Sequence, residues 1–365
     1  MSTTKHNWTK EEILEIHNKP LMELLYEAAT IHRKNHDPNV VQVSTLLSIK
    51  TGGCSEDCGY CPQAARYHTN IEGNDLMSVQ QVKAQALRAK STGSSRVCMG
   101  AAWRNVKDGE EFDQVLEMVR SINKLDMEVC CTLGMITENQ AQRLAEAGLY
   151  AYNHNLDSSE EYYKEVISTR GYQDRLDTID NVRKTNVTVC SGGIIGMGES
   201  LEDRAGMLVA LSTLNPQPES TPINALVAVE GTPLEDQKPV SIWDMIRMVA
   251  TTRIVMPETQ VRLSAGRTQM TREGQAMCFF AGANSIFAGD KLLTTPNPDV
   301  NEDMEMFAIL GMEPQKPFTK KVQPKTVEAS ESQFEALGEK PKWTRPDHTI
   351  ERNEAAKAKA KAIKQ

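Results

Sequence analysis

Hydrophobic and polar positions follow two alternating periods along most of this 365-residue chain. Short runs rich in β-branched residues, typical of buried strands, alternate with longer stretches in which apolar residues recur at helical spacing. The pattern predicts strands at 41–49, 96–100, 128–133, 150–155, 188–195, 223–229, 260–263 and 284–288. It predicts helices between and after them at 79–89, 110–123, 137–148, 159–167, 172–185, 201–211, 242–253 and 271–281.

Eight β/α repeats within about 250 residues predict an α/β fold, a (β/α)8 barrel of the TIM type. A doubly wound sheet shows the same alternation, but its usual mark is a G-x-G-x-x-G turn after the first strand. The turn here is Gly52-Gly53-Cys54, which does not fit. We therefore expect a barrel over 40–312, preceded by a helical extension at 1–39. The tail at 313–365 is rich in Lys, Glu, Pro and Ala, and this composition predicts disorder.

Composition narrows the class of protein. An apolar content of 39% is sufficient for a large core, and the net charge of −8 gives no general reason to expect nucleic-acid binding. The polar N-terminus and the lack of a run of about 18 apolar residues predict neither a signal peptide nor a membrane span, so we expect the cytoplasm. Eight cysteines in such a sequence favour metal or redox chemistry over disulfides.

Three of these cysteines, Cys54, Cys58 and Cys61, form a C-x3-C-x2-C cluster on the loop after the first strand. Thiolates are soft ligands that suit zinc or iron–sulfur clusters. A zinc site would need a fourth ligand, and His68 is the nearby candidate. A disulfide would leave one thiol over. The remaining hypothesis is a four-iron cluster on three thiolates, with one iron open to another ligand.

Other cysteines lie inside predicted strands: Cys98, the neighbours Cys130 and Cys131, and Cys190. Each alone is explained as a small core residue, but thiols from three strands can converge inside a barrel, where inward side chains form layers. A second metal cluster is therefore plausible. Adjacent strand residues point to opposite faces, so only one of the neighbouring pair can face inward. By its chemistry, Arg262 is expected to be a charge partner for anionic sulfur.

The string Tyr152-Asn-His-Asn-Leu-Asp157 ends the fourth predicted strand. Asn153, Asn155 and Asp157 occupy alternate positions and so share one face. A carboxylate commonly accepts from ribose hydroxyls, and amides can pair with a cyclic urea through donor and acceptor. The competing interpretation is that these polar residues cap the next helix. His154 is expected to face away and to be structural.

The C-x3-C-x2-C cluster, with an aromatic residue just before its last cysteine, resembles the signature of the radical S-adenosylmethionine (SAM) enzymes. The wider string from Cys54 to Gln63 is more particularly similar to the biotin synthases. So are Cys98-Met-Gly-Ala-Ala-Trp103, Cys190-Ser-Gly-Gly193 and Arg262-Leu-Ser-Ala-Gly-Arg267. The similarity extends over about 40–312, and several separate motifs agree in order.

The resemblance implies a set of ligands and roles. Cys54, Cys58 and Cys61 would hold a [4Fe–4S] cluster whose open iron binds SAM. A [2Fe–2S] cluster would be held by Cys98, Cys130, Cys190 and Arg262, which leaves Cys131, like Cys278, in the core. Tyr60 would lie near the adenine, and Asn155 and Asp157 would hold the ribose. Dethiobiotin would contact Asn153, Asn155 and Asn224 through its ureido ring and Thr294 and Thr295 near its carboxylate.

The activity implied by the resemblance is insertion of sulfur into dethiobiotin to form biotin, with the [2Fe–2S] cluster as the sulfur donor and no protein side chain as acid or base. A flavodoxin-type electron donor and a homodimer are implied as well. Two alternatives stay open. Another radical SAM enzyme would share the first cluster but not the second set of ligands, and a non-catalytic zinc-binding protein would bind metal without iron or sulfide.

Overall fold

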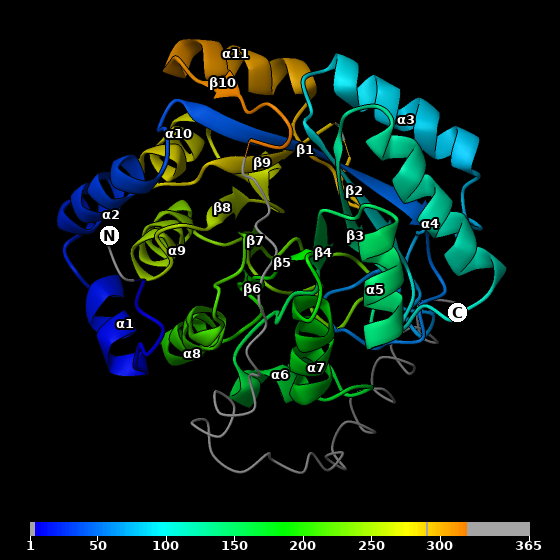
Figure 1. Cartoon of the computed structure of the whole chain (residues 1–365). Helices are drawn as coiled ribbons and strands as arrows, with labels where there is room; N and C mark the ends of the chain where they lie inside the picture. Colours follow the sequence, from blue (N-terminus) through cyan, green and yellow to red (C-terminus); the bar gives the residue numbers. More distant parts are fainter. Residues whose placement is uncertain (1–3, 290, 320–365) are drawn as a thin grey trace.

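The computed structural model describes residues 4–289 and 291–319, and these form a closed parallel barrel (Figure 1). The strands are hydrogen-bonded in the order β1-β2-β3-β4-β5-β7-β8-β9, and β9 pairs back onto β1. A short strand, β6, continues the position of β5 and pairs with β7. The predicted TIM-type fold is confirmed. The strands are β1 Val40–Lys50, β2 Arg96–Ala101, β3 Glu128–Thr132, β4 Ala151–Asn153, β5 Thr188–Cys190, β6 Gly193–Ile195, β7 Ser220–Ala225, β8 Gln260–Leu263 and β9 Ser285–Ala288.

Helices surround the strands on the outside (Figure 1). Local sequence explains several starts, because Thr9, Ser78 and Thr137 each make the capping box expected before a helix. The helix α11 was not predicted; it begins after Asp299, whose carboxylate caps its first turn. The helices are α1 Lys10–His17, α2 Leu21–Asn35, α3 Val79–Ser91, α4 Glu110–Asn123, α5 Glu138–Glu146, α6 Glu160–Val166, α7 Tyr172–Arg183, α8 Leu201–Thr213, α9 Ile242–Val255, α10 Arg272–Phe280 and α11 Val300–Leu310, with a 3-10 turn η1 at Arg267–Gln269.

The predicted strand at 188–195 is two short strands with a break at Ser191 and Gly192. The register is the same on both sides of the break, because Cys190 pairs with Ser220 and Gly193 with Ile223. The facing residue is Pro222, which has no N–H and so interrupts the ladder. The strand β7 begins at Ser220, three residues earlier than predicted. The prediction began after Pro222 because a proline in the sequence argues against a strand.

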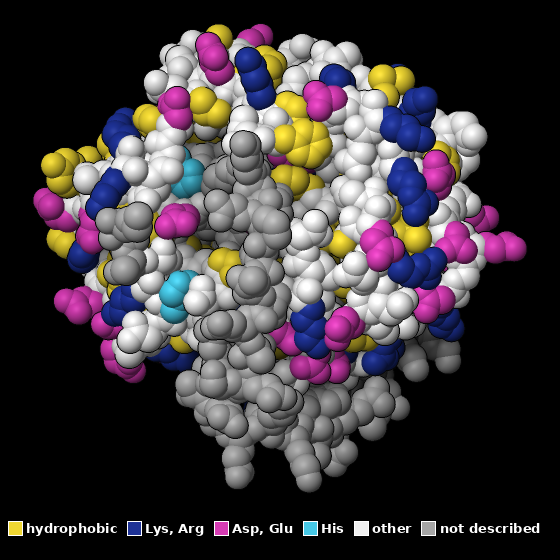
Figure 2. Space-filling view, in the orientation of Figure 1, with side chains coloured by type: hydrophobic (Ala, Val, Ile, Leu, Met, Phe, Trp, Pro, Cys, Tyr) yellow, Lys and Arg dark blue, Asp and Glu magenta, His cyan; other side chains and the backbone are white. Residues whose placement is uncertain are grey.

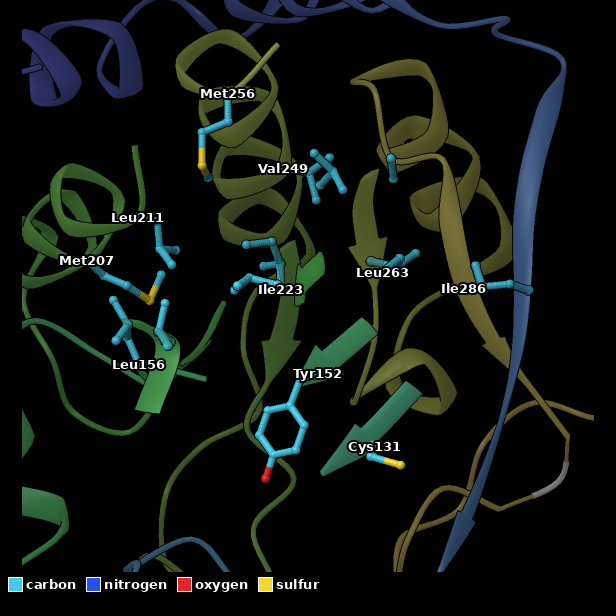
Figure 3. Packing of buried hydrophobic residues seen from close by; sticks show 14 of the residues in the cluster. Cys131, Tyr152, Leu156, Met207, Leu211, Ile223, Val249, Met256, Leu263 and Ile286 are labelled. Carbon is cyan, nitrogen blue, oxygen red and sulfur yellow. The ribbon is translucent and has the colours of Figure 1, made fainter. Parts of the chain in front are cut away.

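The outward faces of the strands and the inner faces of the helices build the main hydrophobic core. Figure 3 shows Met207 and Leu211 of α8 beside Leu156 in this core, and Cys131 belongs to the same cluster of buried side chains. A second, smaller cluster lies inside the barrel and contains Cys98, Cys130 and Cys190. The neighbours on β3 therefore face opposite sides, with Cys130 inward and Cys131 toward the helices.

The chain after α11 crosses the N-terminal end of the barrel. The strand β10 (Glu313–Pro314) pairs with the start of β1, and the Phe318 amide donates to Glu128 Oε1 at 2.7 Å. The Phe318 ring packs edge-on against Tyr150, 6.1 Å between centroids. Residues 313–319 of the predicted tail thus close the end of the barrel opposite the strand C-termini, and the remainder of that prediction, 320–365, lies outside the described residues.

The N-terminal extension packs on the outside of the helical ring, with α1 against α8 and α2 against α9 (Figure 1). Acidic and basic side chains are interspersed over the face drawn in Figure 2, where they are not covered by grey atoms. That surface therefore carries no broad patch of a single sign, in keeping with the modest net charge of −8.

The break between β5 and β6 gives a first prediction. A Cβ on Gly192 would lie 2.0 Å from the Pro222 carbonyl oxygen, so Gly192→Ala should force the strands apart. We expect the free energy of unfolding to fall by about 2 kcal/mol, the usual cost of overpacking, measured by urea denaturation of the metal-free protein. Gly73→Ala is the matched control, because its Cβ would meet nothing closer than 3.6 Å. Equal urea midpoints for the two variants would refute the steric argument.

Candidate active site

A cavity of about 320 Å³ lies at the C-terminal ends of the strands, and its wall collects almost every residue singled out from the sequence. Cys190 is fully buried just behind the wall. The predicted residues on the wall are Cys54, Cys58, Tyr60, Cys61, Cys98, Cys130, Asn153, Asn155, Asp157, Asn224, Arg262, Thr294 and Thr295. Two sets of thiols, separate in sequence, therefore open into one space.

The first set lies on the loop after β1. Gly52 and Gly53 have φ angles of +76° and +73°, which allow the chain to turn sharply before Cys54. The loop then closes on itself, because the Ala65 amide donates to the Cys54 carbonyl at 2.7 Å and the Cys61 amide to the Cys58 carbonyl at 2.9 Å. All three thiols line the same cavity as a result.

Two acidic residues inside the cysteine loop anchor it to the segment before α7. Asp57 accepts hydrogen bonds from the backbone and side chains of Ser168 and Thr169, and Glu56 accepts from the Thr169 hydroxyl. Burial opposes ionisation of Asp57, but these hydrogen bonds outweigh it and hold the pKa of the carboxyl below its usual value. The sequence analysis missed this anchoring, since its partners lie more than 100 residues away.

The second set of thiols lies within the barrel. Cys98 and Cys130 are paired across β2 and β3, and Arg262 Nη1 lies 3.8 Å from Cys190 Sγ. The neighbouring Cys130 thiol, followed by the charges of Arg262 and Arg96, outweighs burial and lowers the pKa of Cys98 below its usual value. The predicted convergence of Cys98, Cys130, Cys190 and Arg262 is therefore seen in the structure.

The surroundings of Arg262 test whether an anionic iron–sulfur cluster fits beside these thiols. Arg262 is 1% exposed and donates to Ser285 Oγ at 2.8 Å and to Gln42 Oε1 at 2.7 Å, both neutral groups. Within the described residues no carboxylate is paired with it, although a buried charge normally needs one. A cluster of sulfides and thiolates is anionic, so this donor set fits such a group.

A single metal ion fits less well. Across residues 4–289 and 291–319, no three His, Cys, Asp or Glu side chains are close enough together to hold one ion. His68, the predicted fourth zinc ligand, is exposed and lies off the cavity wall. Thiols that serve different irons of one cluster can be further apart than ligands of a single ion, which favours the cluster over the zinc alternative.

Polar groups meet at the end of β4. Asp157 has a φ of +68°, an uncommon conformation that aspartate tolerates better than most residues. Tyr60 donates its hydroxyl to Asp157 Oδ2 at 2.7 Å, and Arg175 forms a buried ion pair with the same oxygen. Sequence reasoning missed Arg175, because a single arginine in the first turn of a predicted helix gives no signal of burial.

The amides of the site hold one another in place. Asn153 Nδ2 donates to Asn155 Oδ1 at 3.1 Å and also approaches Cys190 Sγ at 3.3 Å. The Gly192 amide donates to the same Asn155 oxygen at 3.2 Å. Asn224 donates to the Gly193 carbonyl at 2.9 Å. The shared face predicted for Asn153 and Asn155 is present.

His154 is among the residues that line the cavity, and its ring lies 6.4 Å from that of Tyr152, a residue of the main hydrophobic core. That it faces away from the neighbouring asparagines stays a prediction. Burial, then the charges of Arg175 and Arg170, lowers its pKa well below the usual value, so the imidazole is neutral. Its Nε2 has no hydrogen-bond partner in the described part of the chain.

Comparison with known proteins decides the family. A family model described as Radical SAM superfamily matches residues 48–211, and one described as Biotin and Thiamin Synthesis associated domain matches residues 222–313. The biotin synthase of Flavobacterium johnsoniae is 86% identical over 359 residues, 98% of this chain and 99% of the relative. The chain belongs to the biotin synthase family. The biotin synthase of Nostoc punctiforme is 58% identical over 312 residues, covering 84% of this chain and 93% of its own.

Solved structures agree on the fold. A methylornithine synthase superposes with a TM-score of 0.72 at 18% identity, covering 84% of this chain and 94% of its own. The FeFe-hydrogenase maturase from Carboxydothermus hydrogenoformans also gives a TM-score of 0.72, at 16% identity, covering 87% of this chain and 77% of its own.

As a biotin synthase family member the protein is a radical SAM enzyme, which implies SAM and iron–sulfur clusters. In the described chain no helix is both long and apolar enough to span a membrane.

The ion pair of Arg175 gives a second prediction. Arg175→Met would leave the Asp157 carboxylate buried with only the Tyr60 hydroxyl, so we expect the metal-free protein to lose about 3 kcal/mol of stability. Arg143→Met is the matched control, because Arg143 pairs with Asp108 at an exposed site and should cost less than about 1 kcal/mol. Urea denaturation of both variants measures the difference. Similar losses would show that burial of the Asp157 pair is not what matters.

Proposed function

We propose that this chain forms biotin by SAM-dependent radical insertion of sulfur into dethiobiotin. One observation carries the proposal: a three-thiol loop and a separate group of three thiols with an arginine adjoin one cavity. A radical enzyme that only cleaves SAM needs the first group alone. The second group is unexplained unless the reaction also uses the centre that it would hold.

The chain's residues divide between the two centres. Cys54, Cys58 and Cys61 would hold a [4Fe–4S] cluster and leave one iron without a protein ligand. A [2Fe–2S] cluster would be held by Cys98, Cys130, Cys190 and Arg262. When bound, the first cluster supplies the electron that cleaves SAM into a radical able to abstract hydrogen from an unactivated carbon, and the second supplies the sulfur.

Asp157 is suited to hold the SAM ribose. Tyr60 and Arg175 both bind its Oδ2, which leaves Oδ1 available to accept from a ribose hydroxyl. Asn155 uses its oxygen to accept from Asn153 and Gly192, so its amide hydrogens are free to donate into the cavity. Tyr60 is thereby held beside the first thiol loop, where the resemblance to the family places the adenine.

The dethiobiotin site would lie between the two groups of thiols. Asn153, Asn155 and Asn224 offer amides for the ureido ring, and Thr294 and Thr295 lie on the same wall for the carboxylate. Much of the remaining wall is apolar, which excludes water and protects a radical from side reactions. The apolar lining residues include Leu46, Ala101, Ala102, Ile194, Pro222, Phe287, Leu292 and Leu293.

The donor and the assembly are proposed from the resemblance to the family, and the compartment from the polar N-terminus and the lack of a long apolar run. A flavodoxin-type protein is proposed as the electron donor, a homodimer as the assembly and the cytoplasm as the compartment. The domain limits at 40 and 312 also stay predictions, as does the absence of nucleic-acid binding.

The two neighbouring cysteines of β3 provide the sharpest test. After anaerobic reconstitution with iron and sulfide, Cys130→Ala should keep the [4Fe–4S] signal but lose the [2Fe–2S] absorption and form no biotin. Cys131→Ala should keep both clusters and the activity, because Cys131 lies in the helical core. The measurements are iron and sulfide content, visible spectra, and biotin and 5'-deoxyadenosine formed with and without dethiobiotin.

Three results would contradict the proposal. The first is the reverse pattern, with Cys131→Ala losing the second cluster. The second is uptake of zinc in place of iron by the oxygen-protected protein. The third is SAM cleavage by the wild-type protein that does not depend on dethiobiotin, which would point to another radical SAM reaction.

A further inference from the structure

Arg170 lies on the cavity wall between α6 and α7 and is unusual among the buried cations. Its side chain is 7% exposed, and its Nε has no hydrogen-bond partner in the described residues. The nearest carboxylate oxygen is Glu56 Oε1, 3.8 Å away, which is too long for a hydrogen bond. A guanidinium cannot give up its proton to escape this situation.

Most other buried arginines have hydrogen-bonded partners, although Arg183 Nε, like Arg170 Nε, has none in the described residues. Arg96, Arg175 and Arg267 each form ion pairs with buried carboxylates, and Arg262 donates to a serine and a glutamine. Burial without a partner is costly for any charge. The position of Arg170 therefore indicates an anion that occupies the cavity when the enzyme is loaded.

Two further unpartnered atoms lie on the same wall. Glu56 Oε1 and His154 Nε2 are buried and lack hydrogen bonds within residues 4–289 and 291–319. Such groups are rare in native proteins and are usually explained by a missing ion, water or ligand. Glu56 Oε1 still has Arg104 and Arg170 nearby, so Arg170 Nε is the charged donor of the three that calls for an acceptor.

The cysteine loop is the part of the cavity wall nearest to Arg170. Arg170 and Arg175 line the same cavity as Cys58, and Arg170 Nε lies 3.8 Å from Glu56, which belongs to the cysteine loop. Arg175 is already paired with Asp157, whereas Arg170 is not hydrogen-bonded to Glu56. Glu56 has other partners, because its Oε2 accepts from Thr169 and its Oε1 also lies 3.4 Å from Arg104 Nε.

We propose that Arg170 is the charge-compensating residue of the iron–sulfur centre on Cys54, Cys58 and Cys61, with its free N–H directed at the sulfur atoms of that centre. The inference rests on the proposed function for the identity of the cluster. Sulfides and thiolates make the centre anionic, and reduction adds one more negative charge. A cation and a hydrogen-bond donor at its side favour the reduced form and raise the reduction potential.

The test is a redox titration of the [4Fe–4S] cluster in the reconstituted full-length enzyme, followed by electron paramagnetic resonance without SAM. Arg170→Met should shift the reduced-to-oxidised ratio about tenfold toward the oxidised form, a fall of about 60 mV for one electron. Arg170→Lys keeps the charge and should fall by less than half of that. Arg104→Met is the matched control, because Arg104 also faces Glu56 but is 39% exposed, and it should leave the potential unchanged.

Glu56→Gln gives a change of the opposite sign. It removes the negative charge beside Arg170 and should raise the potential, whereas general damage to the loop would not produce opposite shifts in two variants. It also keeps the inference testable if Arg170→Met fails to fold or to take up the cluster.

The SAM dissociation constant, measured by equilibrium binding to the same variants, separates the cluster from the other anion available, the SAM carboxylate. An unchanged potential with SAM binding at least tenfold weaker in Arg170→Met would overturn the inference in favour of that carboxylate. An unchanged potential with unchanged SAM binding would assign Arg170 a structural role and overturn it as well. The potential responds whether or not biotin is formed, so failure of the proposed function would be seen separately.

Discussion

The register of the closed parallel barrel is the constraint on which the rest of the site depends. Cys98 and Cys130 face the interior together because Arg96–Gly100 and Glu128–Thr132 pair residue for residue, and closure of β9 onto β1 brings Arg262 and Ser285 beside Gln42. Strand side chains alternate between faces, so a slip of one residue would replace Cys130 by Cys131 in the interior. The ligands of the second centre are thus determined by backbone pairing, before any metal is bound.

The first thiol group depends on a different kind of interaction. Its loop has no ladder to fix it, and the Asp57 carboxylate attaches it to Ser168 and Thr169 through charge-assisted hydrogen bonds, which are about twice as strong as neutral ones. Those bonds also place Arg170, the next residue along, beside Glu56 of the loop and on the cavity that Cys58 lines. The segment that holds the loop therefore also brings a cation to it.

Periodicity predicted the barrel and most element limits, because each strand or helix buries one face and its own apolar residues show that face. It failed where the cause lies elsewhere in the chain. The break at Gly192 results from Pro222 on the next strand, and the position of Arg170 results from a loop more than 100 residues earlier, where Glu56 is its neighbour. Alternation alone showed that only one of Cys130 and Cys131 faces inward; the pairing of Cys130 with Cys98 decides which.

The two groups of thiols are held in different ways, one on strands and one on a loop. In the proposed function the second centre gives up sulfur, so the residues that would hold it need to stay in place without it. Cys98, Cys130 and Cys190 are on strands, Cys98 and Cys130 are register partners, and Cys190 accepts from Asn153. Arg262 is likewise fixed by Ser285 and Gln42. At the first group of thiols, by contrast, Arg170 keeps an Nε–H without a hydrogen-bond acceptor in the described residues, and leaving such a buried donor unmet costs about 1–3 kcal/mol. The second group is thus held by contacts within the protein, whereas the first keeps a donor that an anion could satisfy.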